Sequence, residues 1–146
     1  DHRSLNDYSK YEICGNTFSD KQFFSSEKYW NTCGKWYENN FNITKEQFSE
    51  FSFKNGFSKG DLIIIIGKEN PQLGDVLIFQ TNRAHPIIHR IMSINPFQTK
   101  GDHNSAQLPE ETNISKNQVI GVAIARIPYV GWLKLFFVEA WQFFTN

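Results

Sequence analysis

Residues 85–91 read HPIIHRI, and residues 99–104 read TKGDHN. Each stretch sets an ionisable side chain, His89 or Asp102, beside apolar or turn-forming residues, a pattern that predicts strands joined by turns. A histidine and a carboxylate held in this way can act as a general base and the acid that orients it in a serine hydrolase. The two stretches therefore predict a β domain that carries a candidate site.

Short apolar runs bounded by turn residues surround this pair of stretches. We expect strands at residues 62–66, 75–80, 86–94, 96–100 and 118–127. The first run is almost entirely isoleucine, which predicts a buried strand. Several short strands separated by turns are typical of an antiparallel β domain. We therefore predict a mainly β fold, with this domain at residues 52–130.

The first part of the chain, residues 1–51, differs in composition and is polar and aromatic with few β-branched runs. We expect a helix over residues 19–37. A second, short helix is expected after Thr44, because Gln47 stands three residues later and completes a capping box. The sequence thus predicts an N-terminal helical and aromatic segment ahead of the β domain.

The last part of the chain, residues 131–146, predicts an amphipathic helix. Lys134, Glu139 and Gln142 share an arc of roughly 140°, and the remaining surface is largely aromatic and aliphatic. Such a helix could pack on the domain, lie in a membrane interface or meet a partner helix. No apolar run reaches the length of about 20 residues that a membrane span needs. Because the chain starts at Asp1, we expect that an N-terminal anchor has been removed.

A series of short motifs resembles the type I signal peptidases in their archaeal and endoplasmic-reticulum form. The motifs are GDLI at residues 60–63, GDVLIF at 74–79, PIIHRI at 86–91, TKGDHN at 99–104, VIG at 119–121 and RIPYVGW at 126–132. Each motif alone is weakly specific, and their order and spacing carry the resemblance. It covers roughly residues 52–135, which leaves the N-terminal segment without a counterpart.

The resemblance implies a serine endopeptidase that cleaves signal peptides from secreted preproteins, after small residues and at the outer face of the membrane. The family serine lies eight residues before the first of the paired Gly-Asp motifs, which is Ser52 here. The resemblance assigns Ser52 as nucleophile and His89 as general base, in place of the lysine of typical bacterial enzymes. Asp102 is expected to orient His89, and Phe53 and Phe57 to contact the substrate.

Two departures from the family pattern stand out. The family's Ser-Met-x-Pro box reads SFKN at residues 52–55, and its second acid, about six positions after the Gly-Asp aspartate, is replaced by Leu108. Glu110 and Glu111 follow close behind. These departures keep a second hypothesis open, in which a catalytically inactive signal-peptidase-like domain serves as a binding or structural module.

The sequence also leaves further assignments of the site residues open. Ser58 could be the nucleophile in place of Ser52, and Lys68 or Lys100 could be the base in place of His89. Zinc is not expected, because His85 and His89 on one strand would lie about 13 Å apart at roughly 3.3 Å per residue, too far to share a metal ion. The proposed reaction requires no metal and no organic cofactor.

The expected partners and compartment follow from this resemblance. They are an extended signal-peptide substrate and a membrane surface met through the aromatic C-terminal segment, while the oligomeric state stays open. Nucleic acid is not expected, because 15 basic residues balance 15 acidic ones. Cys14 and Cys33 could be two free thiols or one disulfide; since the resemblance points outside the cytoplasm, we expect the disulfide.

Overall fold

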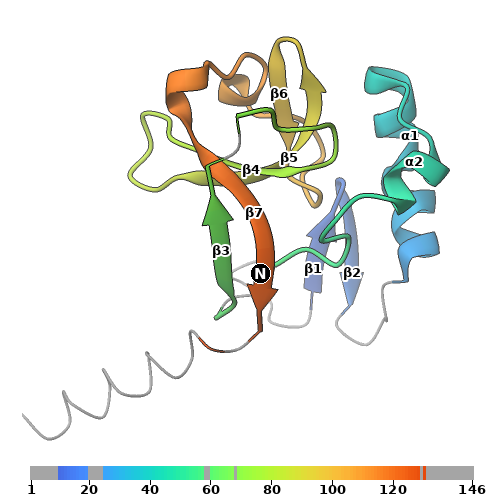
Figure 1. Cartoon of the computed structure of the whole chain (residues 1–146). Helices are drawn as coiled ribbons and strands as arrows, with labels where there is room; N and C mark the ends of the chain where they lie inside the picture. Colours follow the sequence, from blue (N-terminus) through green and yellow to red (C-terminus); the bar gives the residue numbers. More distant parts are fainter. Residues whose placement is uncertain (1–9, 20–24, 58–59, 68, 129, 131–146) are drawn as a thin grey trace, which may run out of the picture.

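The computed structural model of the chain describes residues 10–19, 25–57, 60–67, 69–128 and 130. It contains a two-stranded and a five-stranded antiparallel sheet together with a few short helices (Figure 1). The mainly β fold class is therefore confirmed.

The five-stranded sheet has the strand order β3-β7-β4-β5-β6. Its strands are β3 (Leu62–Ile66), β4 (Val76–Phe79), β5 (Ile87–Ile94), β6 (Phe97–Lys100) and β7 (Val119–Ile127). β4 pairs with β5 on one side and β7 on the other, and all four of its residues are buried, because Leu77 and Phe79 belong to one hydrophobic cluster and Val76 and Ile78 to another. The expected strands are thus present, with ends shifted by no more than one residue.

The expectation that the isoleucine run at residues 62–66 is buried is wrong. This run forms β3, an edge strand that pairs only with β7. Ile64 is 39% exposed and Ile66 is 44% exposed. A continuous apolar run fits a strand covered on both faces, and nothing in the described part of the chain covers β3 in that way.

The paired Gly-Asp motifs form the turns that lead into β3 and β4. Gly60 and Gly74 have φ angles of +91° and +86°, in the left-handed region that favours glycine. The carboxylate of Asp75 accepts a hydrogen bond from the backbone N–H of Gln72 at 2.8 Å, which closes the second turn. Each of these two strands is therefore preceded by a glycine in a left-handed conformation.

The N-terminal segment contains a hairpin and two helices, shown at the right of the sheet in Figure 1. Strands β1 (Lys10–Ile13) and β2 (Asn16–Ser19) pair in register, and helices α1 (Ser26–Phe41) and α2 (Lys45–Ser49) follow. The hairpin was not expected, and α1 begins and ends later than predicted. The capping box of Thr44 and Gln47 at the start of α2 is confirmed.

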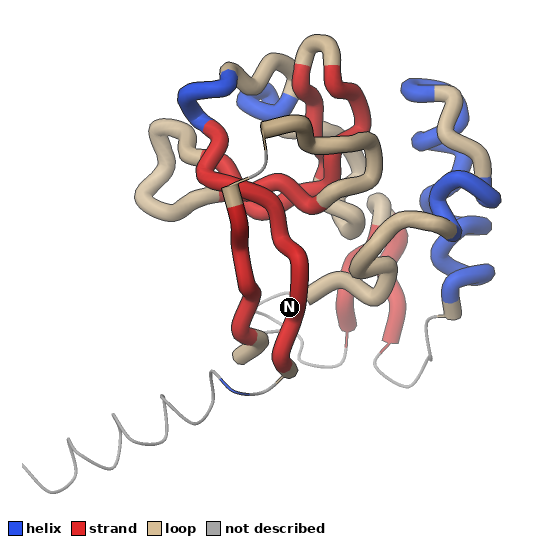
Figure 2. Tube along the Cα trace, in the orientation of Figure 1, coloured by secondary structure: helices blue, strands red, loops and turns tan. Residues whose placement is uncertain are grey.

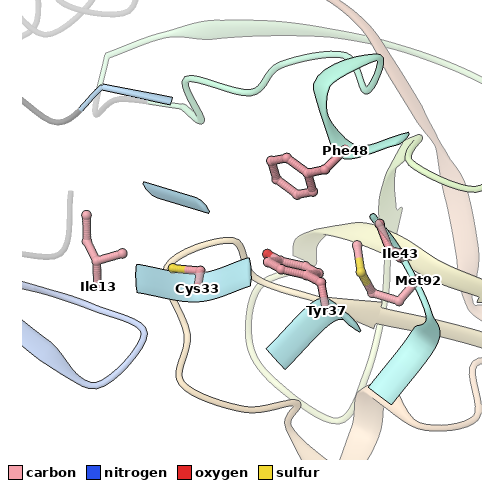
Figure 3. Close-up of a cluster of buried hydrophobic side chains, with 6 residues drawn as sticks. All are labelled: Ile13, Cys33, Tyr37, Ile43, Phe48 and Met92. Carbon is pink, nitrogen blue, oxygen red and sulfur yellow. The ribbon is translucent and has the colours of Figure 1, made fainter. Parts of the chain in front are cut away.

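A buried cluster joins this segment to the sheet (Figure 3). Tyr37 of α1 and Phe48 of α2 face one another with ring centroids 5.0 Å apart, and Met92 of β5 packs beside them. The expected disulfide is confirmed, since Cys14 and Cys33 are bonded with their Cα atoms 5.6 Å apart. The hairpin, α1 and the sheet therefore share one core.

Between β6 and β7 the chain forms two short 3₁₀ helices, η1 (Pro109–Glu111) and η2 (Lys116–Gln118) (Figure 2). The tube in Figure 2 follows this connection back to the start of β7. No helix among the described residues is long and apolar enough to cross a membrane. The amphipathic helix expected at residues 131–146 lies outside the described residues.

Candidate active site

His89 lies near the middle of β5, opposite Leu77 of the neighbouring strand β4. Its side chain is 20% exposed, and Nδ1 is hydrogen-bonded to Oε1 of Glu111. A carboxylate only accepts hydrogen bonds, so this contact holds the proton on Nδ1 and leaves Nε2 as the basic nitrogen. His89 is therefore in the tautomer that a general base requires.

Glu111 is fully buried at the end of η1. Its carboxylate also accepts hydrogen bonds from Thr99 Oγ1 at 3.0 Å and from the backbone N–H of Leu108 at 2.7 Å. Buried charge is tolerated only where such partners are present. The three contacts fix the carboxylate in place, and with it the ring of His89.

Gly101 lies directly against the other edge of the imidazole. A Cβ atom at this position would stand 2.6 Å from Nε2 of His89 and 2.9 Å from Cε1, closer than any side chain allows. The glycine of the TKGDHN motif is therefore required by the close approach of the backbone to His89.

Asp102 contacts a different partner from the one that was expected. Its carboxylate binds the guanidinium of Arg90, with Nη2 to Oδ2 at 2.6 Å and Nε to Oδ1 at 2.9 Å. Burial acts to lower the pKa of Arg90, but the charge of Asp102 and its hydrogen bonds outweigh burial and raise it. The structure thus brings His89 together with Glu111, and Asp102 together with Arg90.

The buried Arg90 also holds the loop that carries Ser52. Nη1 donates to the carbonyl of Ser52 at 2.7 Å and to that of Gly74 at 2.9 Å, and Nη2 donates to the carbonyl of Phe53 at 3.3 Å. At the other end of the loop, Arg126 of β7 donates to the carbonyl of Gly56 at 2.7 Å. Arginines on two strands therefore fix residues 52–56 relative to His89.

Phe53, directly after Ser52, has a φ angle of +57°, which is unusual for a residue with a side chain. A left-handed conformation of this kind costs on the order of 1–2 kcal/mol, and it persists where surrounding contacts fix it. The bond from Arg90 to the Phe53 carbonyl is one such contact. The backbone beside Ser52 is thus held in one shape without the proline of the family box.

A small cavity of about 180 Å³ opens beside His89. Phe57, Ile63, Val76 and Ile88 provide its apolar wall. Phe53 packs on Phe57 with ring centroids 5.2 Å apart. Ser52 is exposed, and within the described part of the chain its hydroxyl makes no hydrogen bond with His89. Phe57 therefore lies at the candidate site, while Phe53 supports it.

Lys100, considered above as a base in place of His89, is fully buried away from this cavity. Its Nζ donates to the carbonyl of Gly101 at 3.0 Å and lies 4.8 Å and 4.9 Å from the ring centroids of Trp36 and Tyr37. Burial lowers its pKa to about 8, although Asp102 and Glu111 act in the opposite direction. Lys68, the second possible lysine base, and Ser58, the second possible nucleophile, lie outside the described residues.

The N-terminal segment contacts the turn that follows Lys100. The backbone N–H of Cys14 donates to the carbonyl of His103 at 2.8 Å, and the Tyr29 hydroxyl donates to the carbonyl of Asp102 at 2.7 Å. Burial, and then the charge of Asp102, raises the pKa of Tyr29 and of Tyr37 above the usual range. Both hydroxyls therefore stay protonated and can donate.

Glu111 is the site residue to which the sequence assigned no role. In the sequence it is only one of two acidic residues that follow Leu108, the position of the family's second acid. The one local feature of the sequence near Glu111 is Pro109, because proline favours the first turn of a helix. Among the described residues no cluster of His, Cys, Asp and Glu side chains is arranged to hold a metal ion.

Known proteins support the motif resemblance. The signal peptidase complex catalytic subunit SEC11 of Plasmodium falciparum is 30% identical over 101 residues, which cover 60% of this chain and 55% of that protein. The subunits of the same name from Verticillium alfalfae and Pyricularia oryzae are each 26% identical over 103 residues, covering 60% of both chains. The resemblance to type I signal peptidases is thereby confirmed.

The signal peptidase relatives are longer proteins. The chain spans a little more than half the length of the curated relatives that it matches. No model of a known protein family matches the chain. The similarity therefore covers only part of these signal peptidase subunits.

Proposed function

We propose that this chain forms the catalytic part of a membrane-associated serine endopeptidase that cleaves signal peptides from secreted preproteins after small residues. The similarity to signal peptidase catalytic subunits supports the substrate class. The observation that carries the proposal is the hydrogen bond between His89 and the buried Glu111, beside a small cavity with one apolar wall. A histidine oriented by a carboxylate is the arrangement that serine hydrolases use.

In the proposed reaction the Ser52 hydroxyl attacks the scissile carbonyl carbon while Nε2 of His89 takes its proton. Backbone N–H groups around Ser52 hold the resulting oxyanion. His89 then returns the proton to the leaving amine, and the signal peptide stays esterified to Ser52. A water molecule, deprotonated by His89, hydrolyses this ester and regenerates the serine.

In this proposal Glu111 takes the orienting role first expected of Asp102. Asp102 instead neutralises Arg90, which holds the carbonyls of Ser52 and Phe53. Asp102 is thus a positioning residue, which acts through Arg90 on the loop at residues 52–56 that carries Ser52. This division of roles is favoured because Glu111 contacts His89 directly, while Asp102 contacts the arginine that binds the carbonyls of Ser52 and Phe53.

The cavity at His89 supports the proposed preference for small residues. Its volume of about 180 Å³ is below the roughly 300–1,000 Å³ of pockets that hold drug-sized ligands. Ile63 of the edge strand β3 lines it. An extended peptide added to this edge would form backbone hydrogen bonds and place one small side chain in the cavity.

We place the enzyme at the outer face of a membrane. Leu62, Ile64, Ile120, Ile124 and Ile127 are exposed along β3 and β7. Large apolar side chains exposed on two neighbouring strands favour a binding surface, and the aromatic segment at residues 131–146 has the composition of an interfacial element. Both features support contact with the lipid surface from which the substrate emerges.

A cleavage assay tests the proposed function. A preprotein is incubated in detergent with the wild-type chain or with Ser52→Ala, and the new N-terminus is sequenced. We expect the wild type to release the mature protein after a small residue and Ser52→Ala to be slower by a factor of about 10³ or more. Equal cleavage by both proteins would exclude Ser52 as nucleophile, and no cleavage by the wild type would favour the inactive binding module.

A further inference from the structure

A second and larger cavity, of about 690 Å³, lies between the N-terminal segment and the Ser52 loop. Ile13, Tyr29, Trp30 and Phe48 line it from the N-terminal segment, and Lys54 lines it from the Ser52 loop. Its volume is within the range of roughly 300–1,000 Å³ that is typical of ligand pockets. Ile13 and Phe48 also belong to the buried cluster in Figure 3, so the wall of the cavity is continuous with the core.

The two cavities share a wall. Asp102 and His103 line both the large cavity and the small cavity at His89. The N-terminal segment contacts both residues: the Tyr29 hydroxyl donates to the Asp102 carbonyl, and the Cys14 N–H donates to the His103 carbonyl. A peptide bound at His89 therefore needs to pass only this turn to reach the large cavity.

The apolar part of the large cavity's lining is mainly aromatic and consists of Tyr29, Trp30 and Phe48 together with Ile13, while the rest of the lining is polar or charged. The ring of Phe48 is stacked on Tyr29 with centroids 5.4 Å apart and lies 5.5 Å from Trp30. Aromatic faces of this kind bind flat or bulky apolar groups. Lys45, Lys54 and Glu27 add charge of both signs at exposed positions on the rim, so the apolar interior is the selective feature.

We propose that this cavity is a second substrate subsite, which takes a bulky aromatic or aliphatic side chain of the same peptide that places a small residue at His89. The proposal rests on the proposed peptidase function. In an extended chain, residues two apart on one face lie about 7 Å apart. The bulky residue is therefore expected two to four positions from the small one.

A peptide series tests the subsite. Each peptide carries one alanine cleavage site in an otherwise polar sequence, and a single phenylalanine is moved through every position from five before to five after the scissile bond. We expect kcat/KM to rise about tenfold over the peptide without phenylalanine at one position or at two neighbouring ones. A flat profile overturns the proposal while leaving the peptidase function intact.

Variants link the effect to this cavity. Ser26→Trp adds a large side chain at an exposed lining position at the start of α1, and Trp30→Ala removes part of the aromatic wall. The quantity compared is the ratio of two values, kcat/KM for the phenylalanine peptide divided by kcat/KM for the reference peptide. In both variants this ratio should fall close to one. Asn117→Trp, at an exposed position in η2 outside both cavities, should keep the full ratio. The same ratio in Ser26→Trp and Asn117→Trp would overturn the assignment.

Binding separates failure of the subsite from failure of the peptidase function. The best phenylalanine peptide and the reference peptide are titrated by calorimetry into Ser52→Ala, which is not expected to cleave them. The wild type could prove to cleave no peptide. In that case, about tenfold tighter binding of the phenylalanine peptide to Ser52→Ala still supports the cavity as a peptide site, provided that the difference disappears when Ser26→Trp is added. Equal affinity for both peptides rejects it.

Discussion

Nδ1 of His89 is hydrogen-bonded to Oε1 of Glu111, a residue 22 positions later in the chain and on a different element. The contact joins the middle of β5 to the short helix η1, and Thr99 of β6 binds the same carboxylate oxygen. The proposed base and the acid proposed to orient it are therefore held by three elements of the sheet domain.

Replacing Glu111 with glutamine tests this relationship. Glutamine keeps the size of the side chain but removes its charge, so it no longer stabilises the imidazolium formed when His89 accepts a proton. We expect kcat for peptide cleavage in Glu111→Gln to fall by about 10² or more, as in known serine hydrolases that lose the acid of their triad.

The neighbouring acid supplies a matched control. The carboxylate of Glu110 pairs with the guanidinium of Arg83 at the surface, 3.1 Å away, rather than with His89. Glu110→Gln should therefore keep kcat within about twofold of the wild type. Equal losses in the two variants would contradict the orienting role of Glu111.

Asp102→Asn should act first on stability. The change leaves the buried guanidinium of Arg90 without its counter-charge, and breaking a buried ion pair in this way costs about 3–5 kcal/mol. Chemical denaturation should show this loss, while the exposed Glu50→Gln should change the free energy of unfolding by no more than about 0.5 kcal/mol. A stable Asp102→Asn protein would show that Arg90 does not depend on this pair.

Lys100 should make stability depend on pH in the alkaline range. Burial lowers its folded-state pKa to about 8, whereas the unfolded value is near 10.4. Between these values the unfolded chain binds more protons, so the free energy of unfolding should rise with pH, by about 2 kcal/mol from pH 7.5 to pH 10. The rise should be absent in Lys100→Met, and it is measured as the difference between wild type and variant in urea. Parallel pH profiles would show that Lys100 titrates normally.

The Cys14–Cys33 disulfide should stabilise the whole chain, because the segment it closes contacts the turn at Asp102 and His103. A crosslink across 19 residues is worth about 3 kcal/mol in the chain-entropy model. Reduction should therefore lower the melting temperature of the wild type. The double variant Cys14→Ser with Cys33→Ser should already melt at the lower temperature and be insensitive to reductant. A wild-type melting temperature that does not change on reduction would contradict this role.

Several elements of the fold could be predicted because their signals are local. The strands β4 and β5 follow from short apolar runs between turn residues, and α2 follows from the capping box of Thr44 and Gln47. The hairpin at residues 10–19 could not be predicted, because it depends on tertiary contacts: the disulfide and the bond from Cys14 to His103. The exposure of β3 depends likewise on its position at the edge of the sheet.

Only part of the candidate site could be predicted, because only part of it has a local signal in the sequence. His89 is marked by its motif, since it stands on a strand with apolar neighbours. The choice between Asp102 and Glu111 depends on which carboxylate the turn after β6 brings to the imidazole, and counting residues does not reveal this. The arginine that binds Asp102 directly follows His89, so alternation along β5 sends the two side chains to opposite faces, each with its own carboxylate.

The proposed mechanism depends above all on Ser52 being the nucleophile of a peptidase, and trapping the acyl-enzyme examines this directly. The chain is mixed with an ester analogue of a signal peptide, quenched in acid within one turnover, digested and analysed by mass spectrometry. We expect one acyl group on Ser52, formed in the wild type and absent in Ser52→Ala. An acyl group on another residue such as Ser58, or turnover of the ester by Ser52→Ala at the wild-type rate, would contradict the assignment of Ser52.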